Sequence, residues 1–358
     1  MISSNLQIVE SMLAKALDAI INEDYGVKET LITLYKEAIR PKIHDLKGIA
    51  TKRLYIIPKT KDTISIVTRC IDLSINSKQI ILFSTSIYDP LNEVVYEYPR
   101  MNSSLGGYAP SFIALRSQDD NLLLSKFLVH VPHRISIHSL EYILQFMVLN
   151  IWLNNAMRTT ETLSVITDTP ILTLGDEHFL KLKLDLLKQL SSKNITLISV
   201  NNRLSISQPI MSQGKSALDD ISVITSEIGK VNEPISIGPI SVKCNGSIIY
   251  VSYIIIPISN SRNAFKYLVF RLETLKEAYD AIVEELGSLH LESWLATNYL
   301  IEGFRFIKVP KDNVYRVLKK LILMLRTKVE EKGLTFTCDS LYVLSQIKDL
   351  ENYMYSIL

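Results

Sequence analysis

The stretch TISIVTRCIDLSI, residues 63–75, is an apolar run that carries one acid, Asp72, near its end. Its many β-branched residues and its lack of Gly and Pro predict a buried strand. The stretches QIILFSTSIY (79–88) and EVVYEYP (93–99) have the same character, and turn formers separate them from their neighbours. We therefore expect a series of strands, mainly antiparallel, between residues 53 and 100.

A second apolar run, LSVITD at residues 163–168, ends in Asp168 and predicts a central strand. A charged amphipathic helix at 178–194 and the strand ITLISV follow it, and this order predicts a parallel crossover. Before it, residues 136–158 are apolar on most faces of a helix, so we expect a buried helix. Glu141 lies near the start of that helix.

The rest of the chain completes a mixed α/β pattern. Residues 5–50, 274–287 and 310–333 predict helices, and residues 236–273 predict strands. This order favours a ribonuclease-H-like mixed sheet flanked by helices, with helical N- and C-terminal extensions. We expect an N-terminal extension at 1–50 that docks a dimer or partner, one domain at 51–335 and a tail at 336–358.

Composition excludes several classes of protein. Of 358 residues, 47% are hydrophobic, which is enough for a substantial core, while a net charge of +2 does not by itself indicate nucleic-acid binding. The three cysteines are widely spaced and form no zinc or redox motif. No phosphate-binding GxxxxGK[ST] loop or bilayer-length apolar run occurs. We expect the N-terminal stretch to be an amphipathic helix and not a signal peptide. We expect a cytoplasmic protein without a membrane partner.

The three acids Asp72, Glu141 and Asp168 each have an ordinary structural explanation. Asp168 could cap the next helix, Asp72 could belong to a turn, and Glu141 could be a first-turn helix acid. Buried carboxylates nevertheless cost several kcal/mol unless a cation or a hydrogen bond compensates them. Acids on two strands and one helix that converge are a common way to hold divalent cations in nucleases. The sequence therefore predicts a metal site formed by these three residues.

The strongest basic clustering lies in RFIKVPKDNVYRVLKKLILMLRTK, residues 305–328, beside an apolar stripe. One explanation is the solvated face of a helix, and the other is a wall that follows DNA phosphates. The histidines of HVPHRISIH (130–138) match no common zinc spacing, and we expect structural or surface roles for them. The predicted nucleic-acid-binding residues are Arg203, Arg305, Lys308, Lys311, Arg316, Lys319 and Lys320.

The order of these segments resembles the NurA family of nucleases between about residues 50 and 330. IDLSINSKQIILFSTSIYDPLNEVVYEYPR resembles the family's opening catalytic region, and SLEY, with Glu141, resembles its helix-borne glutamate. LSVITDTPIL resembles the family's second aspartate strand. YIIIPISNSRNAFKYLVFRLE resembles its paired late strands, which end in an Arg-x-Glu element, here Arg271 and Glu273.

The resemblance implies a divalent-metal-dependent DNA nuclease acting in DNA end processing. It implies Mn²⁺ or Mg²⁺ held by Asp72, Glu141 and Asp168, a homodimer, and a HerA-type hexameric ATPase as partner. The chain departs from the family pattern at Leu73 and Thr169, where the family has glycines, and at Gly303, where the family has a histidine. These departures leave an alternative open, namely a catalytically impaired NurA-fold DNA-binding or scaffold subunit.

Overall fold

The computed structural model describes residues 2–33, 39, 44–45, 51–54, 62–100, 111–155, 163–175, 177–201, 206–212, 220, 223–224, 232–258, 266–286, 291–295 and 305–338. The chain divides into two compact units. The first comprises Met1–Tyr35, Ser65–Thr159 and Lys308–Tyr353, and the second comprises Lys36–Ile64, Thr160–Ile307 and Met354–Leu358. No helix in the described part of the chain combines the length and the apolar character needed to cross a membrane.

The sheet of the first unit has the strand order β1-β8-β9-β7-β5-β4, with β6 added to β5 and β16 added to β4. All of its pairs are antiparallel except β7 with β9, so the sheet is mixed. Its strands are β1 (Glu29–Thr33), β4 (Thr63–Ile75), β5 (Lys78–Asp89), β6 (Val94–Tyr98), β7 (Ile113–Ser117), β8 (Asn121–Leu124), β9 (Val129–Pro132) and β16 (Phe336–Thr337).

The long β4–β5 hairpin confirms the strands predicted on both sides of Asn76 and Ser77. Ile75 pairs with Lys78, so only these two residues form the turn. Both have positive φ, 47° for Asn76 and 66° for Ser77, as a two-residue hairpin turn of the primed type requires. The turn therefore fixes the register of the strand that carries Asp72.

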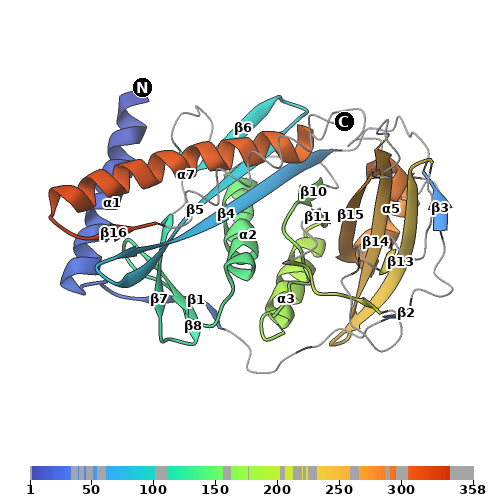
Figure 1. Cartoon of the computed structure of the whole chain (residues 1–358), viewed down its shortest axis with the longest axis horizontal. Coiled ribbons are helices and arrows are strands. Elements are labelled where there is room, and N and C mark those ends of the chain that lie inside the picture. Colours follow the sequence, from blue (N-terminus) through green and yellow to red (C-terminus); the bar gives the residue numbers. More distant parts are fainter. Residues whose placement is uncertain are drawn as a thin grey trace. The chain divides into compact units, whose positions relative to one another are not determined.

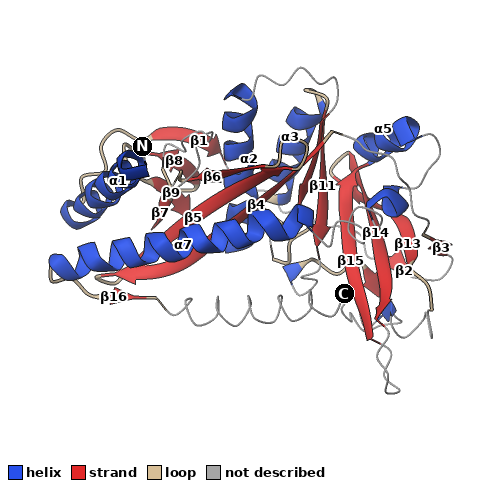
Figure 2. Ribbon diagram, turned by 90° about the horizontal axis from the view of Figure 1, so that it is seen from above, coloured by secondary structure: helices blue, strands red, loops and turns tan. Residues whose placement is uncertain are grey.

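Two helices cover opposite faces of this sheet: α2 (Ile137–Asn155) and α7 (Arg305–Glu331). Adjacent residues of a strand point to opposite faces. On β6, Tyr96 packs edge-on against Trp152 of α2, while its neighbour Glu97 pairs with Arg316 of α7. Figures 1 and 2 both show α7 running along β4. The strands of the first unit thus form a layer between the two helices.

Helix α7 buries the predicted apolar stripe of Tyr315, Leu318, Leu321, Ile322 and Leu325. Its start differs from the prediction, because the helix begins at Arg305 and Pro310 lies inside it. Proline removes one backbone donor from a helix interior. The burial of neighbouring apolar side chains, such as those at 306 and 307, compensates for that loss.

The predicted helix over residues 5–50 is wrong for residues 23–33, because α1 (Ile2–Asn22) ends at Asn22; most of residues 34–50 lie outside the described part of the chain. Glu23 and Gly26 have positive φ, 57° and 69°, which stops the helix. Residues 29–33, ETLIT, then pair with β8 as β1. Their alternating β-branched residues and an available partner strand outweigh the helical spacing of the leucines.

The second unit has the strand order β10-β11-β15-β14-β13-β3, and the short β2 and β12 pair separately. Strands β10 and β11 are parallel and joined through α3 (Leu180–Ser191), which confirms the predicted crossover, and the remaining pairs of the order are antiparallel. The chain thus has mixed sheets flanked by helices. The other elements are β2 (His44–Asp45), β3 (Thr51–Arg53), β10 (Leu163–Thr167), β11 (Ile195–Asn201), β12 (Met211–Ser212), β13 (Ile235–Cys244), β14 (Ser247–Ile258), β15 (Lys266–Leu275) and α5 (Lys276–Leu286).

Candidate carboxylate site

Asp72 lies near the end of β4 at the edge of a pocket in the first unit. Its side chain is 53% exposed, and its Oδ1 lies 3.9 Å from Nη2 of Arg116. Partial burial raises the pKa of the Asp72 carboxyl, and the guanidinium of Arg116 opposes this shift. The pocket has a volume of about 480 Å³ and is lined by Asp72, Leu73, Ser74, Gln79, Arg116, His133 and Thr337.

Arg116 of β7 is held in place by backbone carbonyls. Its Nη1 donates to the carbonyl oxygens of Pro132 at 3.3 Å, His133 at 3.4 Å and Ile135 at 2.6 Å. The side chain is 12% exposed. These contacts fix the guanidinium beside Asp72. Arg116 was not among the predicted site residues, because it lies in the stretch 101–135, where the sequence pattern assigns no elements.

Glu141 of α2 is buried and bonded to the edge of β4. Its Oε1 accepts a hydrogen bond from the Cys70 backbone N–H at 3.0 Å, and its Oε2 lies 3.3 Å from Nδ1 of His138. Cys70 pairs with Phe83 of β5, and the Phe83 N–H donates to Phe112, away from β4. In an antiparallel pair both N–H groups then point outward. Glu141 therefore satisfies an amide that β5 does not reach.

Glu141 contacts the backbone of Cys70, and Asp72 lies two residues further along the same strand. Burial raises the pKa of the Cys70 thiol well above its ordinary value, and the charges of Glu141 and then Asp72 raise it further. Cys70 and Asp72 are two residues apart on β4 and so share one face of the strand. Two of the three predicted carboxylates thus lie near Cys70, and a metal ion shared between them stays a prediction.

Asp168 belongs to the second unit, where it follows β10 and is buried. Hydrogen bonds with side chains of β11 and β15 hold the segment after it. Ser199 Oγ donates to the Thr169 carbonyl at 2.8 Å, and Glu273 Oε2 accepts the N–H groups of residues 171 and 172 at 2.6 and 2.8 Å. The buried Lys183 donates to Thr173 Oγ1 at 2.6 Å. These contacts fix the backbone that follows Asp168.

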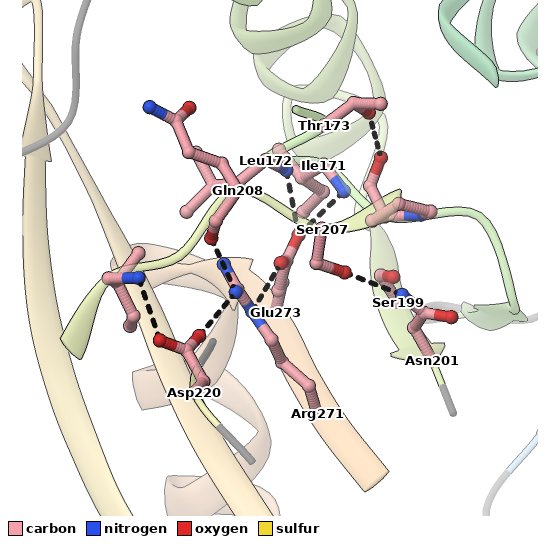
Figure 3. A network of polar contacts seen from close by, with 12 residues as sticks. Ile171, Leu172, Thr173, Ser199, Asn201, Ser207, Gln208, Asp220, Arg271 and Glu273 are labelled. Carbon is pink, nitrogen blue, oxygen red and sulfur yellow. Dashed lines mark hydrogen bonds and ion pairs between the residues drawn. The ribbon is translucent and has the colours of Figure 1, made fainter. Parts of the chain in front are cut away.

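Glu273 is also part of a buried ionic network, drawn in Figure 3. Its Oε1 lies 2.7 Å from Nε of Arg271, in a direction that does not make a hydrogen bond. Nη1 of Arg271 donates to Asp220 at 2.9 Å and to the Gln208 carbonyl at 2.6 Å. Asp220 also accepts from the Tyr253 hydroxyl and from two backbone amides of residues 210–211. The network joins β14 and β15 to Asp220 and to the segments at 171–172 and 208–211.

The predicted basic residues on α7 differ in exposure. Arg316 and Lys319 are exposed and Lys320 is partly exposed, whereas Lys311 is only 2% exposed and so lies off the outer face. Lys308 is partly exposed. Arg326, further along the same outer face, pairs with Glu330 at 2.7 Å. Arg203 and the side chain of Arg305 lie outside the described residues.

The donor type of the predicted metal site fits a hard divalent cation, since Mn²⁺ and Mg²⁺ favour carboxylate oxygens. Asp72 and Glu141 do not suffice alone, because Glu141 already contacts an amide and an imidazole. In the described part of the chain, no group of three or more His, Cys, Asp and Glu side chains is arranged to hold a metal ion. Participation of Asp168 stays a prediction.

Comparison with known proteins finds a likeness of fold to a nuclease. No protein-family model matches the chain. No curated protein matches it either. Among solved structures, the NurA nuclease from Sulfolobus solfataricus is similar with a TM-score of 0.36 and 10% sequence identity, over 79% of this chain and 88% of that one. Because this score is low, the function proposed below rests on the residues of the chain itself.

Proposed function

We propose that the chain is a divalent-metal-dependent nuclease that acts on DNA. The observation that carries the proposal is the contact of Glu141 of α2 with the Cys70 amide of β4, two residues before Asp72 on the same strand. Asp72 is open to a pocket that also holds the arginine Arg116. In this proposal, Asp168 completes the set of ligands for Mn²⁺ or Mg²⁺.

Each residue has a distinct part in this proposal. A bound metal ion would supply activated water and stabilise the leaving oxygen of the phosphodiester. Asp72 would offer that ion an accessible carboxylate. Glu141 would be a second ligand while it also holds the edge of β4 through the Cys70 amide, and Asp168 would be the third. The outer face of α7, with Arg316, Lys319 and Lys320, would attract the DNA backbone.

The proposal extends to partners through the resemblance to the NurA family. We include a homodimer, a HerA-type hexameric ATPase and a role in DNA end processing in the cytoplasm. Size measurement of the purified chain tests the dimer, and co-purification with a HerA-type ATPase tests the second partner.

The decisive experiment is cleavage of linear DNA in Mn²⁺ or Mg²⁺. We expect Asp72→Ala, Glu141→Gln and Asp168→Ala each to reduce cleavage to background. The matched control is Asp119→Ala, because Asp119 is an exposed acid of the first unit outside the pocket. It should keep wild-type cleavage. If the wild-type protein fails to cleave DNA both in Mn²⁺ and in Mg²⁺, the proposal is contradicted.

A second candidate function is a DNA-binding or scaffold subunit without catalysis. It is favoured by the contacts of Glu141, whose two oxygens meet an amide and an imidazole and so compensate its burial without a metal. It predicts no cleavage but salt-sensitive DNA binding. Lys319→Gln with Lys320→Gln should then reduce the slope of log affinity against log salt by about one for each phosphate that is no longer neutralised.

A further inference from the structure

The pocket beside Asp72 has the size and lining of a binding site for a small polar group. Its volume of about 480 Å³ lies within the range of roughly 300–1,000 Å³ typical of ligand pockets. Five of its lining residues besides Asp72 bear polar groups: Ser74, Gln79, Arg116, His133 and Thr337. None of its described lining residues is Phe, Tyr or Trp, so the pocket lacks the broad stacking surface that favours a nucleobase.

Arg116 is prepared to bind an anion in this pocket. All of its hydrogen bonds with described residues come from Nη1, which three carbonyls hold. Nη2 lies 3.9 Å from Asp72, which is too far for a hydrogen bond. The carbonyl contacts fix the guanidinium in advance, so an incoming anion does not have to order it.

The shape of the guanidinium favours a phosphate over a simple halide. Arginine presents parallel N–H donors that match two oxygens of a phosphate group. The hydroxyls of Ser74 and Thr337 and the imidazole of His133 line the same pocket and offer further donors. Asp72 opposes this role, because a carboxylate repels an anion bound beside it.

We infer that this pocket binds a phosphodiester group of a DNA strand through Arg116, with Asp72 as an antagonist of that binding. The inference deepens the proposed function and rests on it for the identity of the ligand. It has a specific consequence. Removing the charge of Asp72 strengthens phosphate binding in the absence of metal. In the wild type, neutralising that charge with Mn²⁺ also strengthens phosphate binding.

The test measures binding without cleavage. A fluorescent single-stranded oligonucleotide is titrated in EDTA and followed by anisotropy, and inorganic phosphate competes against chloride at equal ionic strength. We expect Arg116→Gln and Arg116→Lys to weaken oligonucleotide binding about tenfold, which is typical of losing a hydrogen bond to a charged group. Asp72→Asn should strengthen it severalfold, and phosphate should displace the oligonucleotide better than chloride does.

Arg134→Gln is the matched control, since Arg134 is an exposed arginine of the first unit that pairs with Asp120 outside the pocket. Its affinity should stay within about twofold of wild type. Asp72 is half-exposed, so its variant keeps the test valid even if Arg116 variants do not fold. Unchanged affinity in Asp72→Asn overturns the inference, as does unchanged affinity in folded Arg116→Lys. Because EDTA prevents metal chemistry, failure of the nuclease proposal would appear separately in the cleavage assay.

Discussion

Two arginine–carboxylate pairs, one in each unit, differ in how accessible their charged groups are to a ligand. Arg271 and Glu273 are both 0% exposed and lie 2.7 Å apart, within the network of Figure 3. Arg116 and Asp72 are 12% and 53% exposed and lie 3.9 Å apart. Both arginines are anchored by backbone carbonyls. The buried pair serves to join segments of the fold, whereas the open pair keeps groups that a ligand can reach.

The largest effect tests the buried pair. Glu273→Gln keeps the size of the side chain but removes its charge beside the buried guanidinium of Arg271. Breaking a buried ion pair typically costs about 3–5 kcal/mol, so we expect a loss of that order in the free energy of unfolding. Urea denaturation followed by circular dichroism measures it. The comparison variant, Asp72→Asn, should change stability by about 0.5 kcal/mol or less.

If Glu273→Gln proved as stable as the wild type, the contrast between the two pairs would disappear. A second result bears on the same point. Glu273 also accepts the N–H groups of Ile171 and Leu172. Replacing its carboxylate by an amide should therefore increase hydrogen exchange at these two backbone N–H groups. Exchange unchanged there, with stability lost, would separate the ionic role of Glu273 from its backbone role.

Local patterns in the sequence predict the elements that local forces determine. The apolar run in 63–75, the turn at Asn76 and Ser77 and the crossover through α3 depend on neighbours in sequence, and all are present. The helix predicted beyond Asn22 failed because β1 depends on β8, about 90 residues away. Strands β7 to β9 went unassigned for the same reason, since each pairs with partners that the local pattern does not identify.

The candidate site shows the same difference between what local sequence patterns predict and what contacts between separate segments determine. Asp72 lies on the predicted strand and Glu141 on the predicted helix. The roles of Arg116, Lys183 and Asp220 could not be predicted, because no motif marks them and they bond to residues 19, 10 and 51 positions away, respectively. Arg271 and Glu273 were noted only as an Arg-x-Glu element, which gave no sign that Asp220, 51 residues before Arg271, would join them.

A smaller effect tests whether burial, rather than location in the first or the second unit, determines how a titratable group affects stability. His130 of the first unit is buried and packs edge-on against Tyr25, and burial lowers its pKa to about 4. An unfolded histidine titrates near 6.5, so the unfolded state binds the extra proton first. The contribution of His130 to stability should be intact above about pH 6.5 and lost as pH falls towards 4, by an amount on the order of 3 kcal/mol.

His130→Phe should remove that part of the acid dependence, as measured by denaturant unfolding at several pH values. His133→Phe is the control, since His133 is exposed on the neighbouring segment. It should leave the acid limb unchanged. Equal acid sensitivity in the wild type and in His130→Phe would mean that burial of this imidazole does not control the pH response of the first unit.

The smallest effect concerns the open pair and is seen best in a titration. Partial burial raises the pKa of Asp72, whereas a hydrogen bond from the Ser117 hydroxyl lowers the pKa of Asp119 in the same unit. In the folded protein Asp72 therefore takes up its proton first as pH falls, and its charged form slightly destabilises the fold above its pKa. The carboxyl carbon shifts in an NMR titration should show a higher midpoint for Asp72 than for Asp119. If the charge of Arg116 affects the pKa of Asp72 more than burial does, the midpoint of Asp72 should lie below that of Asp119. That result would mean that Arg116 and Asp72 form a structural ion pair, as Arg271 and Glu273 do.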